Sequence, residues 1–362
     1  MSAASARLDA IRSQIDELDR ELLAGLNRRA RLAQTIADIK DDSDSLGYYC
    51  PDREVQVVRK LIAANPGPLP DGDVERLFRE IMSACRALQQ PMRLAFLGPQ
   101  GTFTEAAALR HFGHTVENVP FESIDAVFRE VESGACQYGV VPVENSTEGV
   151  VTHTLDMFMR SRLAICGEVE LRIHHHLLTK AGDLAAIARV YTHQQSLAQC
   201  RKWLDRNLPA ARRIAVSSNA EGARCAAQEG DAAAVAGEAA AAIYGLAILA
   251  ANIEDEPDNT TRFLVIGEQS VPRTGNDKTS LLLSARNRSG ALYGLLAPFA
   301  RLGINLTRIE SRPARSARWE YVFFVDLEGH AQDPQVAKAL EALDQEGFLI
   351  KVIGSYPRAA AP

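Results

Sequence analysis

Apolar residues recur along the N-terminal part of the chain with a seven-residue period. From Leu8 to Ile39 most positions of that repeat hold Leu or Ile, which predicts a single long helix with an apolar seam. At 1.5 Å per residue this helix would be about 50 Å long. Residues 1–91 are too few to cover a seam of that length, so we expect it to pack against a second chain.

Two shorter helical patterns complete this first region. One runs from Pro51 to Ala64 and is followed by the Pro- and Gly-rich break at 65–70. The other is expected to be capped by Asp73, and its apolar positions recur at helical spacing. These positions are Val74, Leu77, Phe78, Ile81, Met82, Cys85 and Leu88. The pattern therefore predicts an all-α domain over 1–91.

Beyond this region the pattern changes to short apolar runs separated by helical stretches. Strands are expected at 93–97, 138–143, 190–192, 214–216, 232–236 and 263–266. Helices are expected from Glu105, from a cap at Ser146 or Thr147 to Met159, and over 197–206 and 220–229. The alternation predicts a two-lobed α/β domain over 92–268. Its first lobe would comprise about 92–170 and 248–268, and its second lobe about 171–247.

The C-terminal part of the chain shows a third pattern. Residues 269–277 contain Pro272 and Gly275 and are expected to be a linker. After them the order is strand, helix, strand, strand, helix, strand, over 279–285, 291–302, 304–310, 321–326, 334–345 and 349–353. This βαββαβ order predicts an α+β, ferredoxin-like domain over 278–357. Residues 357–362 are expected to be a disordered tail.

Composition narrows the function classes. The 362 residues carry a net charge of −6 with no basic stripe, which argues against a nucleic-acid partner. No apolar run is long enough to span a membrane and no signal peptide is evident, so we expect a cytoplasmic protein. The six cysteines are scattered, which indicates reduced core thiols. The run His174–His176 has no further ligand at suitable spacing, so no metal site is expected there.

Polar residues gather at the ends of predicted strands, where α/β sheets place their ligands. Glu144 and Asn145 end one strand, and Thr260, Thr261 and Arg262 begin another. A capped strand with a surface arginine would show the same residues. The glycine-containing loop 98–104 offers N–H groups to an anion, although a plain strand-to-helix turn would look alike.

Three motifs resemble those of prephenate dehydratases, in that family's order. They are Gly98-Pro99-Gln100-Gly101-Thr102-Phe103, Val143-Glu144-Asn145-Ser146 and Thr261-Arg262-Phe263. The resemblance implies a periplasmic-binding-protein-like pair of lobes around a substrate cleft, and Thr261 as the hydroxyl that donates to the departing oxygen. Arg262 would be a carboxylate clamp or a strand-end brace. The implied contacts are Thr102, Glu144, Asn145, Thr192, Gln199, Thr261, Arg262 and Phe263.

Arg29 falls on the apolar seam of the long helix, where an unpaired cation costs several kcal/mol. Its partner would be an acidic residue of another helix or an anionic ligand. Lys40 lies three turns further on and nearly in line with it, whereas Arg12 could serve only the site of a partner chain. The region resembles the all-helical chorismate mutases, with Cys50 and Cys85 departing from the family pattern. The resemblance implies a site formed by Arg12 of the partner, Arg29, Lys40, Arg53, Glu54, Cys85 and Gln89, with Lys40 and Gln89 as the donors to the ether oxygen.

The last domain resembles the ACT regulatory domain of phenylalanine-sensitive dehydratases. Two motifs carry this resemblance, at residues 287–292 and 310–313. It implies that phenylalanine binds as an allosteric effector to Asn287, Gly290, Ala291, Leu292, Glu310, Ser311, Arg312 and Pro313. Because one open-faced sheet lacks a lid, we expect a second ACT domain to cover the effector. Alternatively, Glu310 and Arg312 pair with each other on the surface.

Together the resemblances cover nearly the whole chain and predict a multidomain enzyme. It would rearrange chorismate to prephenate, convert prephenate to phenylpyruvate without a cofactor, and be inhibited by phenylalanine. We expect a homo-oligomer, at least a dimer. Two alternatives remain at this level, namely a binding module without chemistry and a monofunctional dehydratase with a silent helical dimerisation domain.

Overall fold

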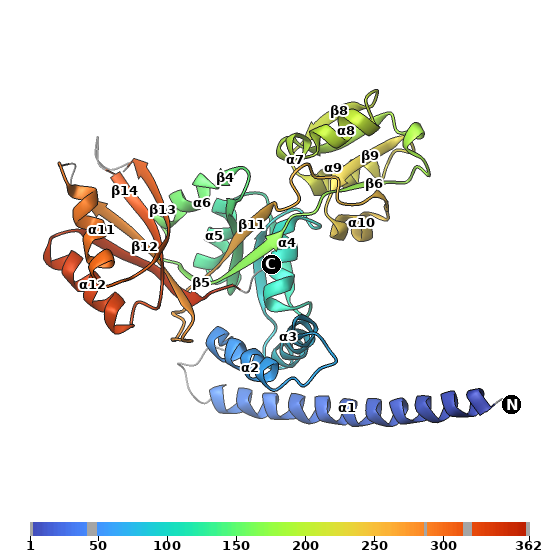
Figure 1. Cartoon of the computed structure of the whole chain (residues 1–362), viewed down its shortest axis with the longest axis horizontal. Helices are drawn as coiled ribbons and strands as arrows, with labels where there is room; N and C mark the ends of the chain where they lie inside the picture. The colour runs from blue at the N-terminus through green and yellow to red at the C-terminus, as the bar shows by residue number, and fades with distance from the viewer. Residues whose placement is uncertain (1–2, 42–48, 286–287, 314–320, 360–362) are drawn as a thin grey trace. The chain divides into compact units, whose positions relative to one another are not determined.

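The computed structural model describes residues 3–41, 49–285, 288–313 and 321–359 (Figure 1). The chain forms two compact units, one of residues 1–92 with 112–116 and one of 93–111 with 117–362. Among the helices described, none combines the length and the apolar character needed to cross a membrane.

The first unit is all-helical, as predicted. It contains α1 (Ala3–Asp41), α2 (Pro51–Ala63) and α3 (Asp71–Ala87). Helix α3 begins two residues before the predicted cap, with Pro70 at its N-cap position. Asp73 instead lies in the first turn and pairs with Arg76 at 2.8 Å. Proline before a helix fixes the extended conformation that an N-cap needs, so the pre-helical break itself sets the start.

Helix α1 buries small residues and exposes its large ones. Ala33 and Ala37 are buried within the unit. The leucines and isoleucines of the seven-residue repeat are at least 46% exposed, and they are Leu8, Ile11, Ile15, Leu18, Leu22, Leu32, Ile36 and Ile39. The contact within the chain therefore uses a different face of α1 from the predicted seam.

The second unit begins with two α/β lobes. The first lobe's sheet has the order β2-β1-β3-β11-β5, with β4 beside β3. Its strands are β1 (Arg93–Leu97), β2 (Glu117–Phe121), β3 (Tyr138–Asn145), β4 (Gly149–Val150), β5 (Ala164–Arg172) and β11 (Thr260–Gly267). Its helices are α4 (Phe103–Phe112), α5 (Ile124–Glu132) and α6 (Thr152–Phe158). Strand β11 lies antiparallel between β3 and β5.

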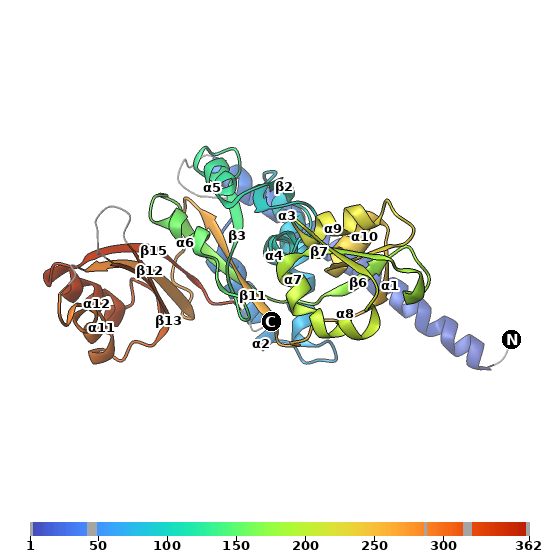
Figure 2. The ribbon, with the colours of Figure 1, turned by 90° about the horizontal axis from the view of Figure 1, so that it is seen from above.

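The second lobe's sheet has the order β10-β6-β9-β7-β8. Its strands are β6 (His176–Thr179), β7 (Arg189–His193), β8 (Arg212–Val216), β9 (Ala232–Ala236) and β10 (Ala247–Ala250). Its helices are η1 (Leu184–Ala186), α7 (Gln194–Gln199), α8 (Arg201–Asn207), α9 (Asn219–Ala226) and α10 (Glu238–Tyr244). The chain passes between the lobes twice, after β5 and before β11 (Figures 1 and 2). The two-lobed α/β arrangement is thus confirmed.

Two local predictions in these lobes were wrong. Ser146 and Thr147 do not cap α6, because the short strand β4 intervenes and Val151 holds the N-cap position. The helix expected over 197–206 is two helices that meet at Cys200.

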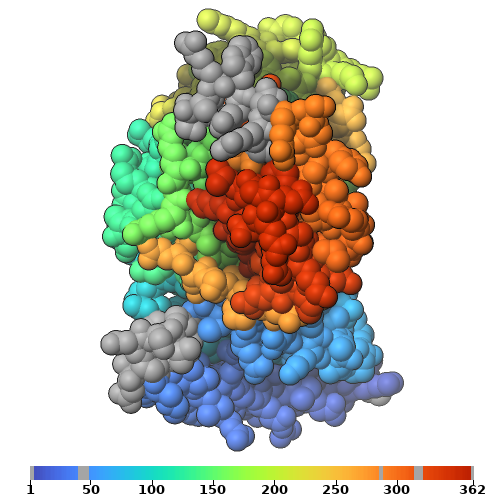
Figure 3. Space-filling view, turned by 90° about the vertical axis from the view of Figure 1, so that its left-hand side faces the viewer, coloured from blue at the N-terminus to red at the C-terminus, as the bar shows by residue number. Residues whose placement is uncertain are grey.

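The last part of the second unit is a ferredoxin-like sheet of order β13-β14-β12-β15, as the βαββαβ pattern predicted. Its strands are β12 (Asp277–Ala285), β13 (Leu306–Pro313), β14 (Tyr321–Glu328) and β15 (Leu349–Pro357). Helices α11 (Ala291–Arg301) and α12 (Pro334–Gln345) cover one face and are seen in orange and red in Figure 3. Pro357 belongs to β15 rather than to a tail, and 360–362 lie outside the described residues.

The opposite face of this sheet is not open. Phe324 and Tyr356 belong to the same buried cluster as Leu155 and Phe158 of the first lobe. The expectation of an uncovered sheet face was therefore wrong. Alternate strand residues point to opposite faces, and both faces here carry apolar side chains, which is typical of a sheet packed between two layers.

Candidate functional sites

A cleft of about 1030 Å³ lies between the two lobes of the second unit. Its lining joins the loop after β1, the adjacent ends of β3 and β11, and helix α7. Of the residues predicted for a substrate site, it includes Thr102, Asn145, Gln199, Thr261 and Phe263.

Asn145 and Thr261 face each other across neighbouring strands. They are register partners in the β3–β11 pair. Asn145 Nδ2 donates to Thr261 Oγ1 at 2.8 Å. Asn145 Oδ1 accepts from the backbone N–H groups of Thr147 and Glu148, both at 3.0 Å. The turn after β3 therefore fixes the orientation of this amide.

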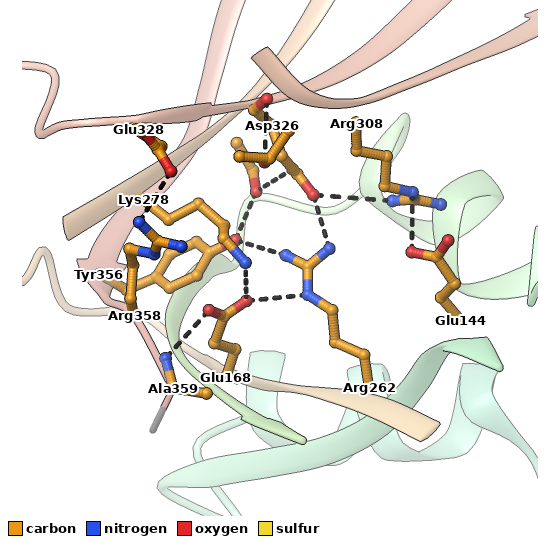
Figure 4. Close-up of polar contacts among 12 residues, drawn as sticks. Glu144, Glu168, Arg262, Lys278, Arg308, Asp326, Glu328, Tyr356, Arg358 and Ala359 are labelled. Carbon is orange, nitrogen blue, oxygen red and sulfur yellow. Dashed lines mark hydrogen bonds and ion pairs between the residues drawn. The ribbon is translucent and has the colours of Figure 1, made fainter. Parts of the chain in front are cut away.

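Glu144 and Arg262 do not line the cleft, because alternation along the strands turns them to the other face of the sheet. Arg262 donates from Nε to Glu168 at 2.8 Å and from Nη1 to Asp326 at 2.6 Å (Figure 4). Glu144 pairs with Arg308 at 3.2 Å. Of the two roles considered for Arg262, this geometry supports the brace.

The groups around Arg262 form one buried charge cluster, which joins the first lobe to the ferredoxin-like sheet (Figure 4). Lys278 Nζ donates to Glu168 at 2.7 Å, and Arg262 Nη2 donates to the Tyr356 hydroxyl at 3.0 Å. Burial acts to raise the pKa of Asp326, but the charges of Arg262 and Arg308 and the hydrogen bond from Ser280 together outweigh it, so that pKa is lowered. The cluster therefore sets the carboxyl groups of Asp326 and Glu168 against buried cations, an arrangement that depends on every partner being present.

Thr192 does not line the cleft itself but contacts a residue that does. It is fully buried, and its Oγ1 donates to Asn219 Oδ1 at 3.1 Å. Asn219 in turn donates to Ser196 Oγ at 2.7 Å, and both of these residues line the cleft. Thr192 was predicted as a direct contact, but the structure places it behind Asn219.

In the helical unit, the predicted site residues gather where α1, α2 and α3 meet. Glu54 of α2 forms an ion pair with Arg86 of α3, a residue that the sequence had not singled out. Burial raises the pKa of Glu54, although the charges of Arg86 and Arg29 oppose the rise. Gln89 Nε2 donates to the backbone oxygen of Ala33, one turn after Arg29, at 2.9 Å.

The other residues predicted for the mutase site do not all lie where the three helices meet. Cys85 is buried, whereas Arg53 is exposed. Arg12 lies on the exposed N-terminal half of α1, 3.6 Å from Asp9. The side chain of Lys40 lies outside the described residues. A single chain thus brings Arg29, Glu54, Cys85 and Gln89 together but leaves Arg12 apart from them.

The predicted effector residues lie at the start of α11 and the end of β13. Gly290 holds the N-cap position of α11 with φ 78°, a conformation that favours glycine. Ala291 is partly buried and Leu292 is 44% exposed, while Asn287 lies outside the described residues.

On β13, Glu310 is partly buried, whereas Ser311 and Pro313 are exposed. Arg312 donates to Asp156 of α6 at 2.7 Å, so the alternative of a Glu310–Arg312 surface pair is wrong.

Several cleft residues were missed from the sequence. They are His175, Ser196 and Asn219, which line the cleft from the second lobe. The run His174–His176 had been weighed only as a metal site, and no group of three potential ligands is close enough to hold a metal among the described residues. His174 instead contacts Glu254 and His175 contacts Gln199, because neighbouring residues point in different directions. These residues lie next to the ends of second-lobe strands, where α/β folds place their ligands, and that position could have identified them from the sequence.

Comparison with known families gives three matches in chain order. Residues 11–90 match chorismate mutase type II, 94–271 match prephenate dehydratase, and 279–345 match the ACT domain. A bifunctional chorismate mutase/prephenate dehydratase of Pseudomonas aeruginosa is 54% identical over 98% of both chains. The counterpart in Neisseria gonorrhoeae is 52% identical over 96% of both chains.

Among solved structures, a prephenate dehydratase from Arthrobacter aurescens in complex with L-Phe is similar to the second unit. It is 38% identical, with a TM-score of 0.68 over 74% of this chain and 90% of that chain. The helical unit of the present chain thus has its counterpart in the bifunctional relatives, whereas this dehydratase matches the remainder.

Proposed function

The chain belongs to the family of bifunctional chorismate mutases/prephenate dehydratases, and we propose that it performs the two reactions at the two separate sites described above. The helical unit converts chorismate to prephenate, and the cleft between the lobes converts prephenate to phenylpyruvate. The alternative of a silent helical domain has less support, because the bifunctional relatives match the chain over almost its entire length.

The mutase reaction is a rearrangement within one molecule, so it requires no nucleophile and no acid–base pair. The site must hold two carboxylates in a folded conformer and donate hydrogen bonds to the ether oxygen as it gains charge. Arg29 is the proposed carboxylate contact, and Lys40 and Gln89 are the proposed donors to that oxygen. Glu54 is proposed to accept from the ring hydroxyl, and its ion pair with Arg86 holds it in place.

We propose that substrate binding redirects the Gln89 side chain. Its Nε2 donates to the backbone oxygen of Ala33 in the present structure. That oxygen is part of a helix and already accepts from the helix ladder, so the bond is easily exchanged for one to a ligand. Cys85 lies one turn before Gln89 and is proposed as an apolar contact.

The dehydratase reaction breaks the bond between the ring and its carboxylate and releases carbon dioxide. The electrons of that bond enter the ring and expel the ring hydroxyl, which takes up one proton and leaves as water. A hydroxyl group that donates to the departing oxygen stabilises the charge that develops there. We assign this donation to Thr261, whose oxygen is already occupied as an acceptor by Asn145 at 2.8 Å.

The hydrogen bond between Asn145 and Thr261 at the edge of the cleft is the observation that carries the dehydratase assignment. Thr102, Asn145, Gln199 and Phe263 are the proposed further contacts, since each lines the same cleft. Glu144, Thr192 and Arg262 are left out of the proposed contact set, because the cleft lining does not include them.

We further propose that two copies of the chain pair through α1. The large apolar residues of its seven-residue repeat are exposed within one chain, and an exposed apolar patch of this kind is typical of a protein interface. In an antiparallel pair, Arg12 of one chain would approach the mutase site of the other. A cytoplasmic location remains a prediction.

Phenylalanine is the proposed effector, bound where α11 begins and β13 ends. The related dehydratase in complex with L-Phe supports this assignment. Gly290 leaves open space where a Cβ would lie, so the carboxylate of an amino acid can approach the N–H groups at the start of α11. A second ACT domain remains the proposed lid, supplied by the paired chain.

The experiment that tests the proposal is to assay chorismate and prephenate as separate substrates, with and without phenylalanine. We expect turnover of both, and inhibition chiefly of prephenate turnover. Prephenate binding without turnover would instead identify the cleft as a binding module. Prephenate turnover without chorismate turnover would identify the helical unit as a silent dimerisation domain.

A further inference from the structure

A continuous series of side-chain hydrogen bonds crosses from the second lobe to the Thr261 hydroxyl. Asn145 Nδ2 donates both to Thr261 Oγ1 and to Asn259 Oδ1, each at 2.8 Å. Asn259 Nδ2 donates to Gln199 Oε1 at 3.2 Å, and His175 Nε2 lies 2.9 Å from the same oxygen. His175 and Asn259 are 1% and 2% exposed, so these two members of the series are shielded from water.

The direction of every bond in this series follows from two backbone groups. The N–H groups of Thr147 and Glu148 are obligatory donors, so the Asn145 atom that they contact is the oxygen. The other Asn145 atom is then an N–H₂ group, which requires an acceptor atom on Asn259. Asn259 therefore presents its own N–H₂ group to Gln199, whose oxygen accepts it.

The same reasoning determines which ring nitrogen of His175 carries the proton. The Gln199 oxygen is an acceptor, so His175 must carry its proton on Nε2 and leave Nδ1 bare. Nδ1 is buried without a hydrogen-bond partner. Burial lowers the pKa of His175, although the bond to Gln199 opposes this effect, and the ring is thereby held neutral. Phe103 contacts the ring in a T-shaped arrangement, with centroids 5.5 Å apart, and keeps it in this orientation.

The consequence for Thr261 is a fixed hydroxyl direction. Its oxygen accepts from Asn145, and the structure shows no protein acceptor for its hydrogen among the described residues. The hydrogen is therefore available to a group in the cleft, which Thr261 lines. A hydroxyl that accepts one hydrogen bond also becomes a better donor, because bonds in a chain polarise one another.

We propose that Asn259 and His175 are positioning residues for dehydration, which hold Asn145 so that the Thr261 hydroxyl donates into the cleft. This inference rests on the proposed dehydratase activity. The series is not a route for protons, because side-chain amides donate without releasing a proton at ordinary pH. The series therefore does not supply the proton that converts the expelled hydroxyl to water. Since the series joins residues of both lobes, it is complete only while the lobes are together.

The first test replaces Asn259 in the full-length chain. Asn259→Ala removes the acceptor for Asn145, and Asn259→Asp keeps that acceptor but opposes the Gln199 oxygen with a second oxygen. We expect both variants to lower kcat for prephenate on the order of 10- to 100-fold, with little change in KM. Asn207→Asp is the matched control, since Asn207 donates only to the backbone of α8, at Trp203.

A second measurement separates positioning from structural damage. If Asn259 acts through Thr261, the double variant Asn259→Ala/Thr261→Ala should turn over prephenate no more slowly than Thr261→Ala alone. Multiplication of the two losses would overturn the proposal, because it would mean that Asn259 acts independently of the hydroxyl. Chorismate turnover reports whether the variant chain is intact.

The third test uses the two ring nitrogens of His175. The amide nitrogen of glutamine reaches the position of Nε2, whereas that of asparagine reaches the position of Nδ1. His175→Gln should therefore retain more prephenate turnover than His175→Asn, by about tenfold for one hydrogen bond. His174→Gln is the control, because His174 contacts Glu254 and does not line the cleft.

The outcomes separate this inference from the proposed function. If the unmodified chain does not turn over prephenate, the proposed function fails. If the unmodified chain is active but the Asn259 variants retain full kcat, Asn259 has no positioning role. If prephenate turnover by His175→Asn equals or exceeds that by His175→Gln, His175 has no positioning role.

Discussion

The guanidinium of Arg262 lies 2.6 Å from Asp326 Oδ2, so a residue adjacent to Thr261 is ion-paired with the ferredoxin-like sheet. Both side chains are nearly buried, and Ser280 donates to the other oxygen of Asp326. Strand β11 thus presents Thr261 to the cleft on one face and Arg262 to the regulatory sheet on the other. Because one peptide unit joins Arg262 to Thr261, a shift of that sheet would act directly on the cleft. Any effect through the linker at 269–277 would add to this.

The first prediction concerns this contact. Asp326→Asn should weaken the inhibition of prephenate turnover by phenylalanine, because it removes a charge that ties the effector domain to β11. Typical coupling free energies of about 1–3 kcal/mol set the upper limit of the loss. The measurement is a phenylalanine titration of both activities, together with direct phenylalanine binding.

Asp277→Asn is the comparison variant for Asp326→Asn, because it alters a contact of the linker and leaves the contact with Arg262 in place. Asp277 is equally buried, at 4% exposure, but its carboxylate contacts Thr274 and Gly275 of the linker. Unfolding should be monitored in parallel, since leaving Arg262 without this partner destabilises the fold by a few kcal/mol. Unchanged inhibition in a folded Asp326→Asn chain would contradict the proposed coupling.

The second prediction concerns the mutase. Arg29→Ala should reduce chorismate turnover by roughly two to three orders of magnitude, because a preorganised charge contact is lost, and leave prephenate turnover intact. Arg28→Ala is the control, as a neighbouring exposed arginine of the same helix. Near-normal chorismate turnover in folded Arg29→Ala would refute the role assigned to Arg29.

The third prediction concerns pairing of chains. Residues 1–90 alone should form an active dimer, because the apolar face of α1 needs a partner. Mixing full-length Arg12→Ala with full-length Arg29→Ala should restore part of the mutase activity, since each mixed dimer contains one site with neither substitution and one site with both. Sedimentation of a fully active monomer would exclude the shared site.

The fourth prediction concerns Thr261. Thr261→Ala should reduce prephenate turnover to a small residual rate while prephenate still binds, and Thr261→Ser should retain a larger part of the rate because it keeps the hydroxyl. Thr260→Ala is the control, since Thr260 Oγ1 donates to the backbone oxygen of Asp258. Equal turnover by the Ala and Ser variants would show that the hydroxyl is not the donor.

The fifth prediction concerns the effector site. Gly290→Ala should weaken phenylalanine binding, because a Cβ at φ 78° is strained and stands where the ligand is proposed to approach. Gly347→Ala is a close control: it has the same φ of 78° and the same open space around a Cβ, but lies beyond α12. Retention of phenylalanine binding by Gly290→Ala would contradict this placement of the effector site, and an equal loss in Gly347→Ala would show that the effect is not specific to it.

The sequence by itself determined the element order, the three family resemblances and all five residues of the proposed cleft contact set. Periodicity shows which residues share one face of one helix or strand, and this was sufficient for α1 and for the βαββαβ region. It also identified Thr261 and Asn145, because both stand at strand ends, where an α/β fold places its ligands.

The tertiary structure decided which neighbour each side chain meets. Alternation along a strand predicts that Arg262 and Thr261 point to opposite faces, but not that the face of Arg262 is covered by the sheet bearing Asp326. Likewise, the pairing of Asn145 with Asn259, and of Gln199 with His175, joins positions far apart in the chain. Such contacts depend on how separate elements pack, and a local pattern of residues carries no information about them.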